Sequence, residues 1–494
     1  MLNKKLFKTL SLVLAIAVAV SATGCNNTTT DIESDITNEG STPIEETDVA
    51  ESDADEVVSN VEMSNTSDGE HVVEADGQTV EYSGVSITKT GDSDLGDEAD
   101  FYGDNSAVFA TNGAVLSLSN AIIDTDGTHA NAIFSYGEGT TVNVSDSEIT
   151  TSGNCSGGIM TTGGGTMNAT NLTVHTTGDS SAAIRSDRGG GTVTVNGGSY
   201  MTDGIGSPVI YSTADITVND ARLESTAAQG VVVEGQNSVT LNNVELIADN
   251  NTKNGDNSDY YQAVMIYQSM SGDADEGLAS FAMTDGSLTN ANGDIFFVNN
   301  TVANITLEHV TIVNQDDDGV LLRAEAAGWG TEGSNGGQVN LYLVNQTVEG
   351  DVVVDNVSAL NMYITSGSSY EGAVNGDNDG EVYVEIESGS TWTLTSDSYV
   401  TSLTCAEGSI NLNGYKLYVN GLEYSDGTSS EGTAITFTTV SSSFAGDDRS
   451  EGEPPEMPNG NAGPGGEGNE PPEMPDGNGP VGDGNEPPVR PEDI

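Results

Sequence analysis

Basic residues are scarce in this sequence. Of its 494 residues, 12 are Lys or Arg against 77 Asp or Glu, which gives a formal net charge of -65. A surface of this charge repels phosphate groups over most of the molecule. The composition therefore argues against nucleic acid as a partner, and equally against attraction to anionic lipid headgroups.

Proline and aromatic residues are also few. Between Ile44 and Glu453 there is one proline, Pro208, and aromatic residues make up 5% of the chain, which has 61 glycines. A helix-rich protein would carry more Ala, Leu, Lys and Arg and less Gly and Thr. The composition is typical of short stacked strands with Gly and Asn at the corners, or of disorder.

The N-terminal segment has the features of a secretion signal. Lys4, Lys5 and Lys8 precede an apolar run at 10–20, which is too short to span a bilayer as a folded helix. The run leads to Ala22-Thr23-Gly24-Cys25, which resembles a bacterial lipobox. We therefore predict a signal peptide at 1–25, lipidation of Cys25 and attachment to the membrane by acyl chains; ordinary secretion is the alternative.

Both ends of the remaining chain are polar and poor in large apolar residues. Residues 26–81 hold 17 acidic residues and no Lys or Arg, and residues 444–494 are rich in Pro, Gly, Glu and Asn. The tail repeats Glu-Pro-Pro-Glu-Met-Pro at 453–458 and 470–475. We predict a disordered acidic stalk at 26–81 and a disordered tail at 444–494.

The body between them is repetitive. Units of 22 to 33 residues can be aligned from 105 to 378, and each contains an apolar strand followed by an alternating one. Matched alternating pairs are Leu116-x-Leu118, Val142-x-Val144, Met167-x-Ala169, Val193-x-Val195, Ile216-x-Val218, Val239-x-Leu241, Phe281-x-Met283 and Ile305-x-Leu307. Alternation with period two indicates one buried and one solvated face.

Such units favour an all-β solenoid, a parallel β-helix of about 12 coils, because a single coil cannot bury its own apolar face. An array of β-sandwiches is the alternative, but it would not align the same apolar columns. We place the β-helix at 82–380 and a bulkier C-terminal β cap, which contains Trp392, at 381–443. Cys155 and Cys405 then lie about ten coils apart, roughly 48 Å, so they cannot form a disulfide.

Short strings in the body resemble one known group of proteins. They are Tyr82–Lys89 and the segments 139–144, 165–171 and 413–421. The chain resembles the right-handed parallel β-helix surface lipoproteins of anaerobic Gram-positive bacteria, over about residues 80 to 425. The resemblance implies a right-handed β-helix on the extracellular face of the membrane and an adhesin-like or carbohydrate-binding role.

One outward column of side chains is a candidate ligand site. If the first apolar residue of each unit points inward, the next points outward, and this column reads Phe109, Phe134, Met160, Arg185, Tyr211 and Val233. Later units continue it with Ile266, Phe297, Leu322 and Val354. Rings stack on sugar faces and Arg bonds hydroxyl or carboxylate groups. We predict a carbohydrate platform of Phe109, Phe134, Arg185 and Tyr211, with Arg188 at the next turn. The alternative is a face covered by a loop or a partner.

Two acidic strings resemble fragments of calcium loops. Asp273-x-Asp275-Glu276 and Asp377-x-Asp379 offer carboxylate oxygens, and Ca²⁺ takes about six to eight oxygen ligands. These five residues are the candidate Ca²⁺ ligands of the sequence. Solvated surface charge is the alternative, because the chain has 77 acidic residues.

Evidence for catalysis is weak in the sequence. The Gly-His-Gly and Arg-x-Lys strings of polygalacturonase-like sites are absent, and the four histidines are isolated. We therefore predict a non-catalytic, lipid-anchored surface protein that binds carbohydrate or a cell-surface ligand. A polysaccharide lyase or glycosidase is the first alternative, and a structural envelope rod is the second.

Overall fold

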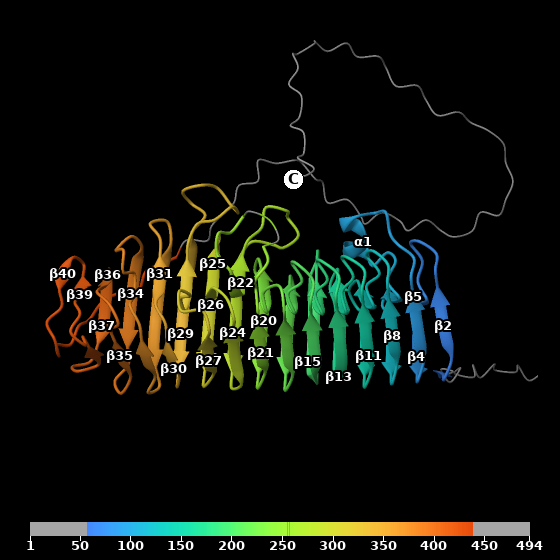
Figure 1. The fold of residues 1–494 in the computed structure, drawn as a ribbon, viewed down its shortest axis with the longest axis horizontal. Coiled ribbons are helices and arrows are strands. Elements are labelled where there is room, and N and C mark those ends of the chain that lie inside the picture. The colour runs from blue at the N-terminus through green and yellow to red at the C-terminus, as the bar shows by residue number, and fades with distance from the viewer. Residues whose placement is uncertain (1–56, 254, 256, 438–494) are drawn as a thin grey trace, which may run out of the picture. The chain divides into compact units, whose positions relative to one another are not determined.

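The computed structural model describes residues 57–253, 255 and 257–437. Its strands stack in parallel, one coil upon the next, in three ladders that run along one axis (Figure 1). This arrangement confirms the prediction of an all-β parallel β-helix. One short helix, α1 (Asp97–Tyr102), interrupts the strands of the described residues.

The first ladder is a sheet of eleven parallel strands. They are β3 (Val73–Asp76), β6 (Val108–Thr111), β9 (Ile133–Tyr136), β12 (Ile159–Thr162), β14 (Ile184–Ser186), β16 (Ile210–Ser212), β19 (Val231–Glu234), β22 (Gln262–Tyr267), β25 (Asp294–Asn299), β28 (Leu322–Ala324) and β31 (Val352–Val354).

The second ladder follows the alternating segments of the repeat. Its strands are β1 (Val58–Ser59), β4 (Thr79–Ser83), β7 (Val115–Ser119), β10 (Thr141–Ser145), β13 (Gly165–Thr176), β15 (Gly191–Thr202), β17 (Asp215–Asn219), β20 (Ser238–Asn242), β23 (Leu278–Thr284), β26 (Thr301–Glu308), β29 (Gly337–Val344), β32 (Ala359–Thr365), β34 (Glu381–Ile386) and β37 (Ser402–Cys405).

The third ladder closes the coils, and the long strands β13 and β15 run through it. It contains β2 (Glu62–Asn65), β5 (Ser86–Lys89), β8 (Ile122–Thr125), β11 (Glu148–Thr151), β18 (Arg222–Ser225), β21 (Glu245–Ala248), β24 (Ser287–Asn290) and β27 (Thr311–Asn314). A four-stranded sheet follows, of β30 (Thr347–Glu349), β33 (Ser369–Glu371), β35 (Thr391–Thr393) and β38 (Ile410–Asn411).

The core lies between the ladders and runs through the whole stack. The predicted alternating positions pair in register, for example Leu116 with Val142 and Val142 with Met167, and they are buried in one continuous cluster. Stacking therefore gives each coil the apolar partner that it cannot supply by itself.

The N-terminal boundary differs from the prediction. Residues 57–81, predicted to belong to the disordered stalk, form β1 to β3 and the start of β4, and β1 pairs in parallel with β4. These strands need few large apolar residues. Val73 and Ala75 are buried in the core, and hydrogen bonds to the neighbouring coil provide the remaining stabilisation. Residues 26–56 and Cys25, for which we predicted a disordered stalk and lipidation, lie outside the described residues.

The C-terminal boundary also differs. β34 and β37 continue the second ladder past residue 381, so the coil stack extends to Cys405. β36 (Ser398–Val400) and β39 (Leu417–Val419) then pair in parallel in a separate small sheet, in which β39 pairs antiparallel with β40 (Leu422–Glu423). Cys155 and Cys405 are free, as predicted, and the predicted tail at 444–494 lies outside the described residues.

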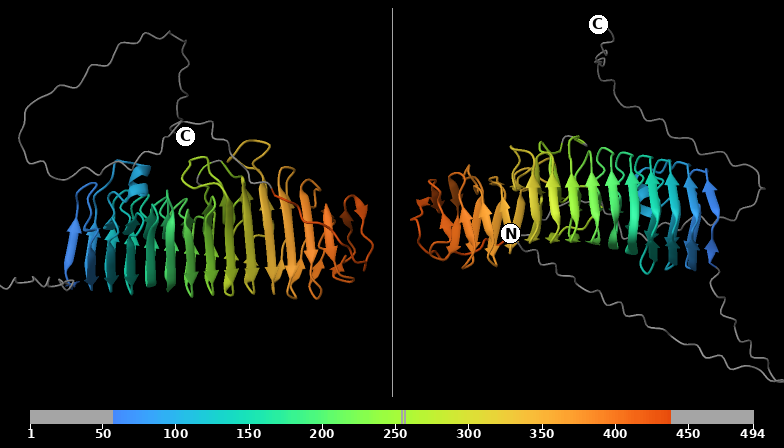
Figure 2. Two further views of the ribbon diagram at one scale, coloured as in Figure 1. Left: turned by 180° about the vertical axis from the view of Figure 1, so that it is seen from behind. Right: turned by 60° about the horizontal axis from the view of Figure 1, so that its bottom comes forward.

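The longest connections gather along one edge of the stack. Figure 1 shows α1 and the loops near β22 and β25 projecting from the upper edge, and the second view from behind shows the same arrangement (Figure 2). The opposite edge carries short turns. The outer surface of the first ladder is therefore the surface on which long loops can build a site.

Candidate functional site

The outward column of the first ladder exists, but its N-terminal part is covered. Phe109, Phe134 and Met160 pair in register and are buried in a small cluster beneath α1. A Cβ on Gly103, the residue that ends α1, would lie 2.5 Å from the Phe109 ring, which shows how closely the helix lies on the rings. The prediction that Phe109 and Phe134 form an exposed platform is wrong, because the insertion around α1 buries both.

Arg185 lies beside these rings and is engaged by two buried carboxylates. Its guanidinium is 3.0 Å from Asp100 Oδ2 and 3.0 Å from Asp187 Oδ2. Burial alone would raise the pKa of Asp100, but Arg185 and His129 outweigh it and hold that pKa below its ordinary value. For Asp187 burial prevails and raises the pKa to about 6. The contacts of Arg185 within the protein make it a poor contact for an external ligand.

Arg188 is also paired within the protein. Its guanidinium lies 2.6 Å from Asp273 Oδ1 and 3.8 Å from the centre of the Phe101 ring. Asp273, a predicted calcium ligand, is therefore the ion-pair partner of a predicted ligand-binding arginine.

The other predicted calcium ligands do not come together. Asp273, Asp275 and Glu276 lie in the loop before β23, whereas Asp377 and Asp379 lie in the loop before β34. Four steps of the second ladder separate these strands, roughly 19 Å at the usual strand spacing. The five residues do not form one cation site. The described residues hold a different group of close metal-ligating side chains, Asp100, His129 and Cys155 beneath α1.

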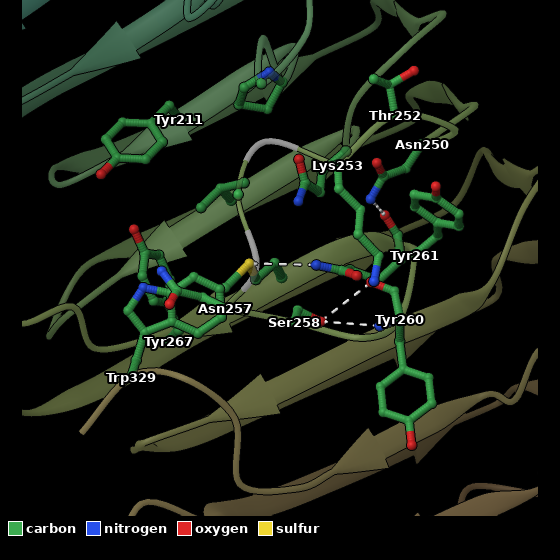
Figure 3. A pocket seen from close by; sticks show the side chains of 17 residues that line it. Tyr211, Asn250, Thr252, Lys253, Asn257, Ser258, Tyr260, Tyr261, Tyr267 and Trp329 are labelled. Atoms are coloured by element: carbon green, nitrogen blue, oxygen red, sulfur yellow. Dashed lines mark hydrogen bonds between the residues drawn. The ribbon is translucent and has the colours of Figure 1, made fainter. Parts of the chain in front are cut away.

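Tyr211, one of the predicted platform residues, lines a cavity. The cavity is a cleft of about 300 Å³ on the outer face of the first ladder (Figure 3). Its floor comes from β16, β19 and β22, through Tyr211, Val232, Met265 and Tyr267. Its walls come from the described residues of the long loop before β22, such as Lys253 and Tyr260, and from Trp329 of the loop after β28.

The two loops are held against each other and against the ladder. The Gly328 N–H donates to the Asn257 carbonyl at 2.7 Å, and Asn335 donates to the carbonyls of Ala327 and Trp329 at 2.7 and 2.8 Å. Trp329 meets Tyr267 edge to face, with ring centres 5.1 Å apart. The rings of the cleft are therefore positioned before any ligand arrives.

Tyr260 lies across the cleft from Tyr267 and Trp329, and its ring is turned away from them, over Arg323 (Figure 3). Tyr260 is 37% exposed, and its ring centre lies 3.8 Å from the guanidinium of Arg323, which is itself paired with Asp294 at 2.6 Å. The cation–π contact and the hydrogen bond that the Tyr260 hydroxyl donates to Glu325 Oε1, at 3.4 Å, hold the ring in place.

Glu234 fixes the hydroxyl groups on the floor. It is 1% exposed and accepts a hydrogen bond from Tyr211 and another, at 3.0 Å, from Tyr267. Burial, with Tyr267 and Glu234 nearby, raises the pKa of Tyr211 well above its ordinary value; burial and Glu234 do the same for Tyr267. Both phenols therefore stay neutral, and each ring keeps one orientation.

The described lining combines rings with neutral hydrogen-bonding groups. Besides the aromatic residues, it contains Gln229, Asn250, Thr252, Lys253, Asn257, Ser258 and Gln262. Gln262 Oε1 is buried and has no hydrogen-bond partner, so one acceptor on the cleft floor is unused. Among the lining residues that the structure describes there is no Asp or Glu.

Most of the cleft was missed by the sequence prediction. Tyr260 and Lys253 lie in the insertion that makes 230–262 the longest repeat unit, and Trp329 lies in the next longest, 319–350. Unit length was the available signal, because extra residues in a solenoid form loops on one face. Arg323 was missed because of register: it follows Phe297 in the outward column, where Leu322 was expected.

Comparison with known proteins found no match: no family model, no curated protein and no solved structure is significantly similar to this chain. Among the described residues, no helix has the length and apolar character needed to cross a bilayer.

Proposed function

We propose that this protein is a lipid-anchored cell-surface β-helix that binds carbohydrate in the cleft and does not cleave it. The observation that carries the proposal is the set of prepositioned rings, Tyr211, Tyr260, Tyr267 and Trp329, around a cleft with neutral polar groups. Sugar rings offer apolar faces for stacking and hydroxyl groups at their edges, which is the pattern that this lining complements.

The size and charge of the cleft support a short neutral segment of a glycan. A volume of about 300 Å³ lies at the lower end of the range for small-molecule sites. The described lining carries one cation, Lys253, and no carboxylate. A lining with so little charge suits a neutral sugar, which needs no oppositely charged partner. The acidic surface around it disfavours strongly anionic polysaccharides.

The location rests on the N-terminal sequence. The basic residues, the apolar run and the lipobox-like Ala22–Cys25 support export and acylation at Cys25. A lipid anchor would hold the β-helix at the extracellular face of the membrane, where polysaccharides are accessible.

The test is glycan binding by the protein without its signal segment, on a glycan array and then by calorimetry. Tyr260→Ala and Trp329→Ala should each weaken binding of the positive glycan about tenfold or more, because each removes a stacking surface. Tyr415→Ala, at an exposed tyrosine of the C-terminal cap, is the matched control and should leave the affinity unchanged.

The same samples separate the alternatives. Release of reducing ends or of unsaturated products would show that the protein is a hydrolase or a lyase. Binding that survives both Tyr260→Ala and Trp329→Ala would place the ligand elsewhere. Absence of binding on the whole array would favour a structural role in the envelope.

A further inference from the structure

A second cluster of functional side chains lies beneath α1, apart from the cleft. Asp100 of α1, His129 and Cys155 each offer one metal-ligating atom, and these atoms all lie within 4.8 Å of one another. Asp100 and His129 are buried and Cys155 is half-buried. An oxygen, a nitrogen and a sulfur atom therefore lie close together beneath α1.

The coil repeat brings the histidine and the cysteine together. His129 and Cys155 occupy equivalent turn positions before β9 and β12, and both have left-handed backbone conformations, with φ of +58° and +55°. The His129 N–H donates to the Asn154 carbonyl, and the Cys155 N–H donates to the Asp179 carbonyl. Equivalent positions in neighbouring coils lie about 4.8 Å apart, so the two side chains are neighbours although 26 residues separate them in the chain.

The histidine ring has an unused nitrogen. His129 Nδ1 lies 3.2 Å from Asp100 Oδ2, with a side chain that is 8% exposed, but the contact lacks hydrogen-bond geometry and the atom has no hydrogen-bond partner. A buried ring nitrogen normally has a partner, because leaving it unpaired is unfavourable. This nitrogen is therefore available to a ligand within the cluster.

The charges of the surroundings leave room for a cation. Asp100 and Asp187 contribute two negative charges, and Arg185, in contact with both, contributes one positive charge. A divalent ion that binds as the Cys155 thiol releases its proton would bring this sum from minus one to zero. Asn131 holds Asp100 Oδ1 at 3.1 Å, and such a partner orients a ligating carboxylate.

We propose that Asp100, His129 and Cys155 form a binding site for Zn²⁺. Zinc accepts carboxylate, imidazole and thiolate ligands together, at about 2.0–2.3 Å in a tetrahedral arrangement. Ligand atoms then lie roughly 3.5 Å apart, so a small movement from the present separation completes three of the four positions. The metal displaces one proton from the cysteine and forms a Zn–S bond, while Arg185 keeps its contact with Asp187.

Such an ion would connect α1 to two successive coils. The helix has six residues and its N-terminal cap makes no side-chain hydrogen bond, so little within the helix itself holds it in place. The metal would therefore fix the cover over Phe109 and Phe134. This inference does not depend on carbohydrate binding.

The experiment is a titration of the chelator-treated protein, without its signal segment, with Co²⁺ as a spectroscopic probe. We expect one Co²⁺ per chain, a thiolate-to-cobalt charge-transfer band, and loss of the band on addition of Zn²⁺. Cys155→Ser should abolish the band, and His129→Gln should weaken binding at least tenfold. Cys405→Ala is the matched control, because Cys405 is the other thiol of the processed chain and should not affect the band.

Circular dichroism of each variant shows whether it is folded, so loss of the band in a folded Cys155→Ser protein is specific. Absence of any cobalt band from the folded wild-type protein would overturn the proposal. So would a band that persists in Cys155→Ser or disappears in Cys405→Ala. In calorimetry, a Zn²⁺ affinity that is lower in Cys155→Ser than in wild type would support the site. Equal Zn²⁺ affinities of the two proteins would exclude it.

Discussion

Asp100 and Asp187 contact the same guanidinium, yet their pKa values are displaced in opposite directions. Asp100 has Arg185, His129 and Asn131 around it, so burial is outweighed and its pKa is lowered. Asp187 is buried with fewer compensating partners, and its pKa is raised to about 6. A single arginine therefore does not fully offset the burial of two carboxylates.

Asp187 makes stability depend on pH. Because its folded-state pKa of about 6 exceeds the ordinary 3.8, folding favours its protonated form. Its contribution to stability is complete below about pH 4 and is lost as the pH rises through 6. The displacement corresponds to roughly 3 kcal/mol.

Asp187→Asn should remove this dependence. In urea unfolding with a chelator present, the wild-type free energy of unfolding should fall, relative to the variant, by roughly 3 kcal/mol between pH 4 and pH 7. Parallel profiles for the two proteins would show that the carboxyl of Asp187 is not displaced.

At the scale of the element, one column of glycines sets the spacing of the coils. Gly127, Gly153, Gly178 and Gly204 occupy equivalent turns, and a Cβ on each would lie 1.8–2.0 Å from a carbonyl oxygen of the preceding coil. A contact this short requires the two coils to move apart. The glycines at this turn are needed because the backbones approach so closely.

Gly178→Ala should therefore destabilise the stack. We expect the free energy of unfolding to drop by about 2–3 kcal/mol, because the new Cβ would meet the Gly153 carbonyl at 1.9 Å. Gly376→Ala is the matched control: the nearest atom to its Cβ is 3.8 Å away, so it should change stability by no more than about 0.5 kcal/mol. Equal effects in thermal unfolding would contradict the close approach.

The register of the strands could be predicted where neighbouring repeat units have similar lengths. The prediction of register failed where their lengths differ. The columns through Phe109, Phe134, Arg185 and Tyr211 were placed correctly. The following unit, 230–262, is the longest, and the outward residue there is Val232, where Val233 was expected. A slip of one residue exchanges the inward and outward faces of a strand, which is how Arg323 was assigned to the wrong column.

At the scale of the whole molecule, the predictable part is what repeats. Coil stacking, the apolar core and the absence of a Cys155–Cys405 disulfide follow from periodic apolar positions. The cleft and the cluster under α1 come from insertions that occur once each, and their folding depends on contacts between distant units. The β-helical fold of residues 57–81 was also missed, because low apolar content suggested disorder although the adjacent coil provides a template.

The net charge of -65 also acts on the whole molecule. Like charges repel within the folded chain, and salt screens them, with a screening length of about 30 Å at 0.01 M and about 10 Å at 0.1 M. The melting temperature should therefore rise as NaCl is increased from about 0.01 to 0.5 M. A melting temperature that falls or stays constant would show that the acidic groups do not limit stability.

The most direct test of the proposed function uses the two tryptophans of the chain. Trp329 lines the cleft, whereas Trp392 is fully buried in the core and donates its N–H to the Gly372 carbonyl. Tryptophan fluorescence during titration with an array-positive glycan therefore reports on the cleft. The account predicts a saturable change with the affinity found by calorimetry, absent in Trp329→Phe. Calorimetric binding of that glycan without any change in wild-type fluorescence would contradict binding in the cleft.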